Sequence, residues 1–282
     1  MKVNTSILIP GSKYHVYNRG INGTDIFKAP PNYELFLKKY EEHVSPVVRT
    51  YAYCLLKNHF HILLEVKTRD EILKQYDIPG QNEAFLKKFS DDESTGKFVS
   101  RQLGHLFNGY TQCINKAYRR TGGLFEEPFR RIPVLTNSYV TNLIGYIHQN
   151  PQNHGLVPDF AAYPYSSYQR ILDGEPAFIE SAWVLDWFGG RDGYIKFHRN
   201  GGISIDAVTT IDAVTTIDDV VDTPTLLGMR GGSSVGDGPT SPIGSVGRVR
   251  RSVAEEGLNR FYLRDNGKDE LFLRDTSGTK SQ

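Results

Sequence analysis

Cysteine is scarce in this 282-residue chain, which has only Cys54 and Cys113. Two cysteines exclude a disulfide framework and a four-cysteine zinc site. Long apolar runs are missing as well: nothing approaches the ~20 consecutive apolar residues of a membrane helix. Ile7-Leu8-Ile9 is too short for the core of a signal peptide. The P-loop pattern of nucleotide-binding proteins is also absent. We therefore expect a reduced, cytoplasmic protein without a membrane partner.

The composition divides the chain near residue 200. The net charge of +1 combines 24 basic and 20 acidic residues before residue 201 with 9 basic and 12 acidic residues after it. Thirty of the 33 aromatic residues also precede residue 201, whereas 12 of the 27 glycines follow it. A core needs large apolar side chains, so we expect residues 10–190 to form the folded domain. Residues 191–282 are expected to be a flexible or weakly ordered tail of unknown role.

The tail has two low-complexity features and one structural signal. Ile-Asp-Ala-Val-Thr-Thr occurs at 205–210 and again at 211–216, and a Gly/Ser/Pro stretch runs from 231 to 247. Two copies are too few for a repeat architecture. Asn266-Gly267 stands between two short apolar runs, which indicates a small hairpin over residues 260–275.

Hydrophobic periodicity predicts seven elements in the order strand, helix, strand, strand, helix, strand, helix. They span residues 14–18, 32–43 (capped by Asn32), 47–56, 59–66, 98–118, 132–135 and 137–150. Pro151 is expected to end the last helix, and the charged residues 67–97 to form an exposed insertion. The first six elements follow the split βαβ pattern. The expected fold class is therefore α+β, a ferredoxin-like (RRM-like) antiparallel sheet with helices on one face.

His59-Phe60-His61 lies on one of the predicted strands. Positions i and i+2 of a strand point to the same side, so the two imidazoles can hold one metal ion. A chance pair of surface histidines is the alternative. Glu65, on the same side of the strand, is either a carboxylate that orients a histidine or a solvated charge at the strand end.

Tyr146 and Asn150 are four residues apart on a predicted helix and therefore share a face. Together they can supply a nucleophile and an oxygen ligand. The alternative is a core tyrosine followed by an asparagine that caps the helix. Tyr110, on the preceding helix, is the rival nucleophile, but Ile114 rather than an amide stands four residues after it.

Positive charge gathers between residues 96 and 134, where seven basic residues face two acidic ones and aromatic residues are interleaved. This combination suits single-stranded nucleic acid, because bases stack on aromatic rings and phosphates need counter-charge. An ordinary solvated helix face would have the same composition. The candidates for phosphate contacts are Arg119, Arg120, Arg130 and Arg131.

Taken together, these motifs resemble the single-tyrosine HUH transposases, and among them the REP-associated tyrosine transposases (RAYT). The resemblance covers about residues 10–172. It consists, in order, of Tyr14–Gly20 (YHVYNRG), Asn58–Leu64 (NHFHILL), Gly122–Phe125 (GGLF), Tyr146–Pro151 (YIHQNP) and Tyr163–Tyr168 (YPYSSY). Lys57 stands where the family usually has proline before the histidine motif.

The resemblance implies a metal-dependent single-stranded DNA endonuclease and strand transferase, that is, a transposase. Tyr146 falls on the nucleophile, which forms a 5′-phosphotyrosine, and His59 and His61 fall on the pair that binds Mg²⁺ or Mn²⁺. Asn150 falls on the third ligand, with His148 as the alternative. The implied partner is single-stranded DNA that forms hairpins. Both a monomer and a homodimer stay open.

Two other functions fit parts of the pattern. A domesticated relative that binds single-stranded or hairpin DNA without cutting would keep the basic aromatic region, but it would not need His59, His61 and Tyr146 together. A two-histidine phosphoesterase that acts on RNA ends needs two His-x-Ser/Thr motifs, which the sequence does not have. The sequence therefore favours the catalytic function.

Overall fold

The computed structural model describes residues 6–76 and 90–200. These residues belong to the first of the two units, 1–223 and 224–282, into which the chain divides. The predicted tail beyond residue 200, including its hairpin at 260–275, lies outside the described residues. No helix within 6–76 and 90–200 is long and apolar enough to span a membrane.

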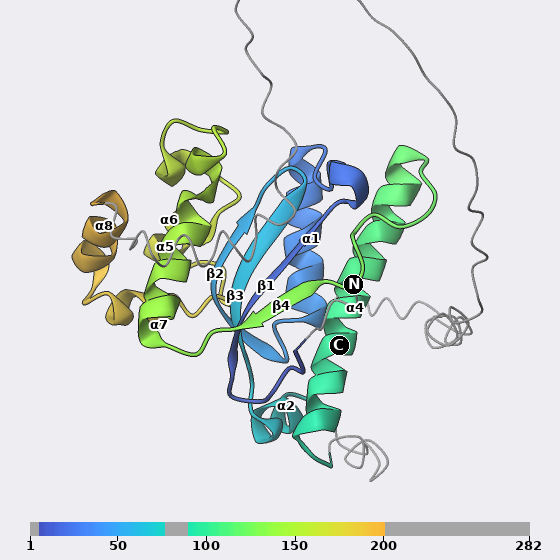
Figure 1. Ribbon diagram of the computed structural model, residues 1–282, viewed down its shortest axis with the longest axis horizontal. Coiled ribbons are helices and arrows are strands. Elements are labelled where there is room, and N and C mark those ends of the chain that lie inside the picture. The colour runs from blue at the N-terminus through green and yellow to red at the C-terminus, as the bar shows by residue number, and fades with distance from the viewer. Residues whose placement is uncertain (1–5, 77–89, 201–282) are drawn as a thin grey trace, which may run out of the picture. The chain divides into compact units, whose positions relative to one another are not determined.

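Four strands form one antiparallel sheet (Figure 1). They span Lys13–Arg19 (β1), Val48–Leu55 (β2), His59–Val66 (β3) and Arg130–Pro133 (β4). Their order across the sheet is β2-β3-β1-β4, so the first strand lies between the third and the fourth. This is the order that the split βαβ pattern requires. The ferredoxin-like α+β fold predicted from the element order is therefore confirmed.

Helices pack on both faces of this sheet (Figure 1). The long ones span Pro30–His43 (α1), Asp92–Tyr118 (α4) and Asn137–Asn153 (α5). Phe60 of β3 contacts Phe36 of α1 and Phe107 of α4, with ring centroids 5.2 and 5.8 Å apart. His61 points the other way, because side chains alternate along a strand, and contacts Tyr146 of α5. Thus α1 and α4 cover one face, as predicted, whereas α5 packs on β2 and β3 from the other face, which the prediction of helices on one face had left bare.

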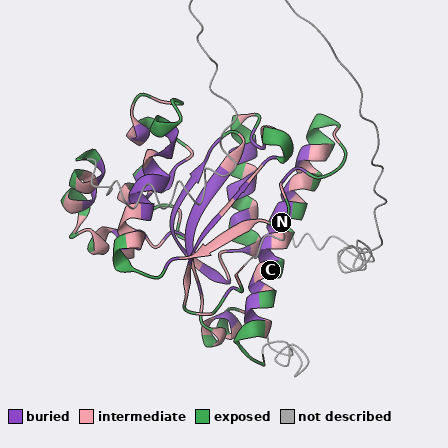
Figure 2. Cartoon of the chain, viewed as in Figure 1, coloured by how far each residue is buried: buried purple, intermediate pink, exposed green. Residues whose placement is uncertain are grey.

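Because helices cover both faces of the sheet, its central strands are largely buried (Figure 2). Six of the eight residues of β3 are buried, and only His59 and Glu65 are partly exposed. All four residues of β4, at the edge of the sheet, are partly exposed. Burial therefore does not alternate along β3, the strand that carries the histidine pair.

Two helix ends differ from the prediction. α1 begins at Pro30, and Asn32 lies in its first turn, where Oδ1 accepts hydrogen bonds from the backbone N–H groups of residues 28 and 29. α5 continues through Pro151 to Asn153. Proline removes one intrahelical hydrogen bond, but the helix ends two residues later, so the loss is confined to its last turn.

The segment 67–97 is not simply an exposed insertion. It contains a short helix, Arg69–Gln75 (α2), whose Ile72 is fully buried. It also contains the first turn of α4, which begins at Asp92 rather than at the predicted Phe98. Residues 77–89, between these two helices, lie outside the described residues.

The predicted domain boundary at residue 190 is too early. Three short helices follow α5 and span Ser167–Asp173 (α6), Ser181–Trp187 (α7) and Arg191–Arg199 (α8). Tyr194 and His198 of α8 are buried, so this helix is part of the folded domain. Helices of seven to nine residues give too few turns for a periodic pattern to stand out in the sequence.

Candidate functional site

β3 presents His59 and His61 on the sheet face that α5 covers. Their ring centroids lie 5.1 Å apart, edge to face. Tyr146 of α5 lies opposite, with its ring centroid 5.7 Å from that of His61. Both His61 (2% exposed) and Tyr146 (6% exposed) are buried. The structure thus brings the predicted nucleophile against the predicted histidine pair, from elements far apart in the sequence.

Asn150 lies one helical turn after Tyr146 and on the same face of α5. It is buried, and its side chain is close enough to His59 to oppose the lowering of the pKa of that imidazole. Tyr146 and Asn150 therefore approach the two histidines together, because one helix carries both.

Three buried atoms of this cluster have no hydrogen-bond partner among the described residues: His59 Nε2, His61 Nε2 and Asn150 Oδ1. Buried polar atoms without partners are rare in folded proteins and call for an explanation. Two imidazole nitrogens and one amide oxygen are suitable ligands for a divalent cation. Residues 6–76 and 90–200 contain no cluster of three His, Cys, Asp or Glu suited to a metal ion, so the amide oxygen is the third donor that this arrangement offers.

Burial also sets the protonation state of the histidines. It lowers the pKa of His59 to about 3, and His154 and Arg19 contribute in the same direction. Burial likewise lowers the pKa of His61, with the neighbouring imidazoles of His15 and His59 as further causes. Both imidazoles are therefore neutral near pH 7, which is the state in which a histidine can bind a metal ion.

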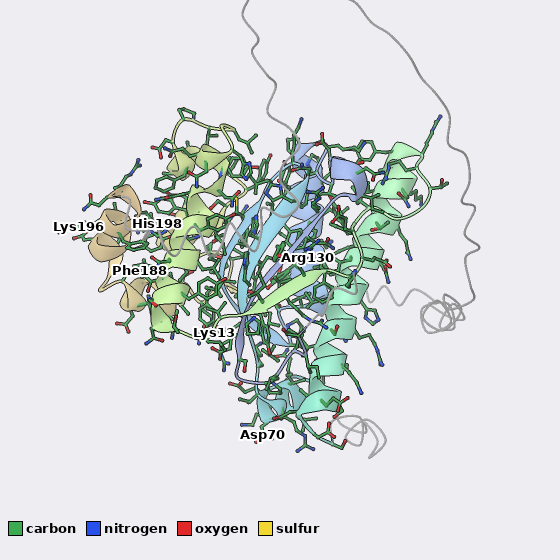
Figure 3. All side chains as sticks on the ribbon, in the orientation of Figure 1. Lys13, Asp70, Arg130, Phe188, Lys196 and His198 are labelled. Atoms are coloured by element: carbon green, nitrogen blue, oxygen red, sulfur yellow. The ribbon has the colours of Figure 1, made fainter. Side chains whose placement is uncertain are left out.

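His148, the alternative third ligand, faces away from this site. It is fully buried, and both of its ring nitrogens are engaged: Nδ1 with His198 Nε2 (2.9 Å) and Nε2 with Ser167 Oγ (2.8 Å). Ser167 Oγ also bonds to the backbone of Tyr53 in β2. Figure 3 shows His198 on α8. His148 thus fixes α5 to α8 and the edge of the sheet, and it is not placed to bind a metal ion with His59 and His61.

No known family model matches the chain. A protein of Haemophilus influenzae named as a REP-associated tyrosine transposase is 28% identical over 147 residues, which make up 52% of this chain and 70% of that protein. The chain is similar in sequence to this REP-associated tyrosine transposase. The resemblance inferred from the motifs is thereby confirmed.

Two solved structures are similar at 14% identity. One is a REP-associated tyrosine transposase bound to a REP hairpin, with a TM-score of 0.42 over 61% of this chain and 86% of that chain. The other is a bacterial tRNA(His) guanylyltransferase-like protein in complex with GTP, with a TM-score of 0.34 over 54% of this chain and 67% of that chain. Both TM-scores are below 0.5, so the similarity of this chain to the transposases rests on the sequence comparison.

The four arginines predicted to contact DNA phosphates lie in different places. Arg130 of β4 (labelled in Figure 3) is the register partner of Tyr17 in β1, which is in turn the partner of His61. Directly paired residues point to the same face of a sheet, so Arg130 shares the face of the histidines. Arg131 points the other way and donates a hydrogen bond to Ser100 of α4 (3.0 Å).

Arg119 and Arg120 lie beyond the C-terminal end of α4, in the connection to β4. Arg119 is exposed and ends the helix in the left-handed conformation, with φ of 51°. Arg120 is partly exposed and donates a hydrogen bond to Asn115 Oδ1 (3.1 Å). Both guanidinium groups are at the surface, and a contact with DNA stays a prediction for each.

Tyr110, the rival nucleophile, lies on the opposite side of the sheet. Its hydroxyl donates a hydrogen bond to the carbonyl of Ile26 (2.7 Å), and its ring packs against Phe36 of α1. Burial raises the pKa of its hydroxyl. The structure therefore does not bring Tyr110 to the histidines.

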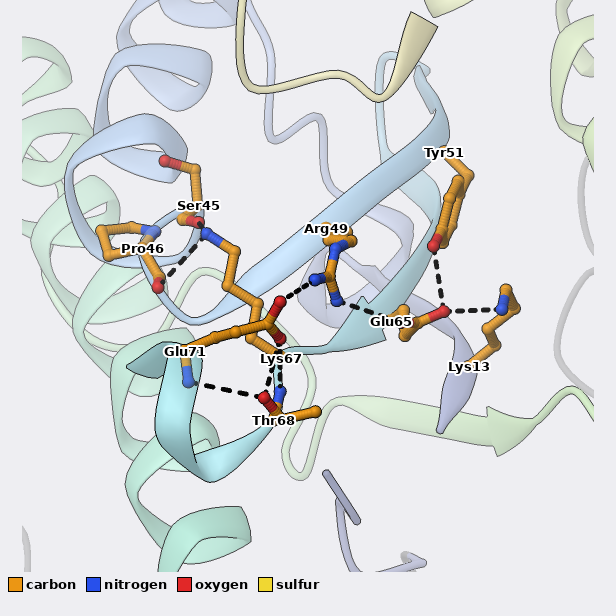
Figure 4. A network of polar contacts seen from close by, with 9 residues as sticks. All are labelled: Lys13, Ser45, Pro46, Arg49, Tyr51, Glu65, Lys67, Thr68 and Glu71. Carbon is orange, nitrogen blue, oxygen red and sulfur yellow. Dashed lines mark hydrogen bonds and ion pairs between the residues drawn. The ribbon is translucent and has the colours of Figure 1, made fainter. Parts of the chain in front are cut away.

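Glu65 belongs to a network of ion pairs at the far end of β3 (Figure 4). Its carboxylate accepts hydrogen bonds from Lys13 Nζ (2.6 Å), Tyr51 Oη (2.9 Å) and Arg49 Nη1 (3.1 Å). Arg49 also pairs with Glu71 at the start of α2. Glu65 thus links three strands and α2. It is neither a carboxylate that orients a histidine nor a merely solvated charge.

Three residues of β1 face the site and were missed by the sequence reasoning: His15, Tyr17 and Arg19. The ring of Tyr17 stacks on His61 with centroids 5.8 Å apart, and Arg19 is the register partner of His59. The period of two along YHVYNRG could have placed them on one face. Nothing in the sequence alone says that this face is the one that carries the histidine pair.

His154 also lies beside the site. It is the C-cap residue that directly follows α5, four residues after Asn150, so it continues the stripe of Tyr146 and Asn150 at the end of the helix. Its ring centroid is 5.2 Å from that of His59, and its side chain is exposed. His154 was not predicted to lie near the site, because the predicted helix ended before Pro151.

We expect the metal-free protein to lose stability as the pH falls from 7.5 to 5. Burial lowers the pKa of His198 to about 4 and shifts those of His15 and His148 in the same direction. Below about pH 6.5 the unfolded chain binds protons that the folded chain excludes, so this stability is present above that pH and lost below it. At about 1.4 kcal/mol per pH unit, His198 alone accounts for about 2 kcal/mol at pH 5.

The measurement is urea unfolding at several pH values in the presence of a chelator. A free energy of unfolding that stays constant between pH 7.5 and pH 5 would contradict the burial of neutral histidines. The carboxylates whose pKa is lowered, such as Asp159 and Glu71, titrate below this window and do not confuse the result.

Proposed function

We propose that this chain is a metal-dependent endonuclease and strand transferase that acts on single-stranded DNA through Tyr146. The observation that carries the proposal is the contact of the Tyr146 ring with His61, beside three buried lone-pair atoms without partners. A tyrosine with a purely structural role would not need such neighbours. The relationship to REP-associated tyrosine transposases supports the same reaction class.

The phenol of Tyr146 is the proposed nucleophile. Its oxygen forms a bond to the phosphorus of a DNA phosphodiester, and the bond from phosphorus to the 3′ oxygen breaks. The phenolic proton leaves, and the 3′ oxygen gains a proton to become a hydroxyl. The 5′ phosphate stays on the protein as a phosphotyrosine. Because one phosphate ester replaces another, reversal of the step joins strands without ATP, in keeping with the absence of a P-loop.

A divalent cation would be held by His59 Nε2, His61 Nε2 and Asn150 Oδ1, the three unpartnered atoms. When bound, Mg²⁺ or Mn²⁺ supplies positive charge that polarises the scissile phosphate. Imidazole ligands alone would also suit zinc, so the choice of Mg²⁺ or Mn²⁺ comes from the family resemblance. The chain's own contribution is to keep both imidazoles neutral, because burial lowers the pKa of each.

The DNA is proposed to approach along the sheet face shared by Tyr17, Arg19 and Arg130. Guanidinium groups neutralise phosphates, and an aromatic ring can stack on an unpaired base. Arg119 and Arg120, at the surface beyond α4, are proposed to extend this contact. Hairpin-forming DNA is proposed as the substrate from the family resemblance.

A gel assay for a covalent protein–DNA adduct tests this function. The full chain is mixed with labelled single-stranded oligonucleotides that form hairpins, either with Mn²⁺ or with a chelator. We expect an adduct that survives denaturation of the protein and that forms only with Mn²⁺. Salt-dependent binding that yields no adduct on a broad oligonucleotide pool would overturn the proposal in favour of a binder that does not cut.

A further inference from the structure

We infer that His15 is a positioning residue that holds His61 in the neutral tautomer whose Nε2 is free to bind a metal ion. The inference rests on the proposed function, since it assumes that His61 Nε2 is a ligand. It assigns to the first strand a part in the metal site, although no group of that strand is itself among the proposed ligands.

His15 lies directly against His61. His15 Nε2 is 3.0 Å from His61 Nδ1, and the two rings stack with centroids 5.1 Å apart and an angle of 26° between their planes. His15 is fully buried. Its register partner is Leu63, two residues along β3 from His61, so the histidines are diagonal neighbours on one face of the sheet. This contact is therefore fixed by strand pairing.

The hydrogen bond between the two neutral imidazoles contains a single proton, which belongs either to His61 Nδ1 or to His15 Nε2. If His61 binds a cation through Nε2, that atom must offer its lone pair, and a neutral imidazole then carries its proton on Nδ1. His61 Nδ1 therefore donates to His15 Nε2. Consequently His15 accepts at Nε2 and carries its own proton on Nδ1. The metal-binding state thus specifies the tautomers of both rings.

His59 is held in the same tautomer by a different partner. Its Nδ1 lies 2.7 Å from Asn58 Oδ1, and a carbonyl oxygen can only accept. His59 therefore carries its proton on Nδ1 and keeps its lone pair on Nε2. The two histidines differ in one respect: Asn58 Oδ1 allows a single arrangement, whereas His15 can either accept from His61 or donate to it.

A second observation concerns His15 Nδ1, which is buried without a hydrogen-bond partner among the described residues. In the metal-binding arrangement this atom carries a proton that has no acceptor, which is unfavourable. In the opposite arrangement it carries only a lone pair, and His61 Nε2 is protonated. With a cation on His61 Nε2, acceptance of the His61 Nδ1 proton by His15 Nε2 excludes this opposite arrangement.

Direct titration of the full chain with Mn²⁺ tests this inference, because it reads metal affinity without any reaction. His15→Leu removes the acceptor, and we expect the affinity for Mn²⁺ to fall about 10- to 100-fold, as for other partners of metal-binding histidines. His15→Gln supplies an amide oxygen that can accept from His61 Nδ1, and it should keep at least the affinity of the unchanged chain. His61→Ala serves as the reference for loss of the site.

The matched control is His198→Leu. His198 is also buried and also makes a histidine–histidine hydrogen bond, with His148 (2.9 Å), but it lies on α8. Its replacement should leave the Mn²⁺ affinity unchanged. A thermal melt of each variant checks that it is folded. Imidazole ¹⁵N chemical shifts of the unchanged chain with Mg²⁺ need no variant, and we expect His15 to be protonated at Nδ1.

The outcomes separate this inference from the proposed function. Unchanged affinity in His15→Leu, together with loss in His61→Ala, would overturn the role of His15 and leave the metal site standing. If His15→Gln bound Mn²⁺ as weakly as His15→Leu, the tautomer argument would be overturned. A proton on His15 Nε2 in the Mg²⁺-bound chain would overturn it as well. Equal binding by His61→Ala and the unchanged chain would overturn the proposed metal site and this inference with it.

Discussion

Tyr146→Phe is expected to abolish the covalent protein–DNA adduct, whereas Tyr17→Phe is expected to retain it. Removal of the phenolic oxygen removes the proposed nucleophile, and loss of a nucleophile lowers rates by on the order of 10³-fold or more. Phenylalanine keeps the ring that packs on His61, so the fold should be unchanged. The measurement is the yield of adduct on labelled single-stranded DNA with Mn²⁺.

Tyr17 is the sharpest control for this experiment. Its ring centroid is 5.8 Å from that of His61, almost the same as the 5.7 Å of Tyr146, but the ring stacks on His61 instead of meeting it edge to face. Tyr146 shares its helix face with Asn150, whereas Tyr17 lies on the strand. Loss of the adduct in Tyr17→Phe and its retention in Tyr146→Phe would exchange the roles of the two tyrosines.

The double variant His59→Ala/His61→Ala should lose the Mn²⁺-dependent adduct, with a decrease on the order of 100-fold or more. It should also lose the rise in melting temperature that Mn²⁺ gives the unchanged chain. A cation that binds only the folded state adds about 2.7 kcal/mol of stability at 100 times its Kd. Without the two imidazoles the cation loses two of its three proposed ligands, so both the adduct and the rise in melting temperature should be lost.

His43→Ala/His105→Ala is the matched control for the double variant. These histidines lie on α1 and α4, with ring centroids 5.9 Å apart and edge to face, much as in the pair on β3. Neither is near Tyr146 or Asn150, since α1 and α4 cover the opposite face of the sheet. Equal loss of the adduct in both double variants would show that the effect is not specific to the β3 pair.

The fold could be predicted for the elements that are long enough to show a periodic pattern in their own sequence. β3 has the predicted bounds, and the order of the first six elements sufficed for the sheet topology. The three short helices after α5 could not be predicted in the same way. They are stable because tertiary contacts bury a few large residues, such as Tyr194, and not because their own sequences repeat.

The site could be predicted in part from the two periods of secondary structure. The period of two placed His59 and His61 on one side of a strand, and the period of 3.6 placed Asn150 on the face of Tyr146. The same rule argues against His148, which is two residues from Tyr146 and therefore about 200° around the helix. The contact of His15 with His61 depends on the register between β1 and β3, which no local pattern reveals.

The most direct test of the central claim is to digest the protein–DNA adduct with a protease and to identify the modified peptide by mass spectrometry. We expect the nucleotide remnant, linked through its 5′ phosphate, on Tyr146 alone. The same remnant on Tyr17 or Tyr110, or no adduct with Mn²⁺ on any hairpin in the pool, would contradict the assignment of Tyr146 as the nucleophile.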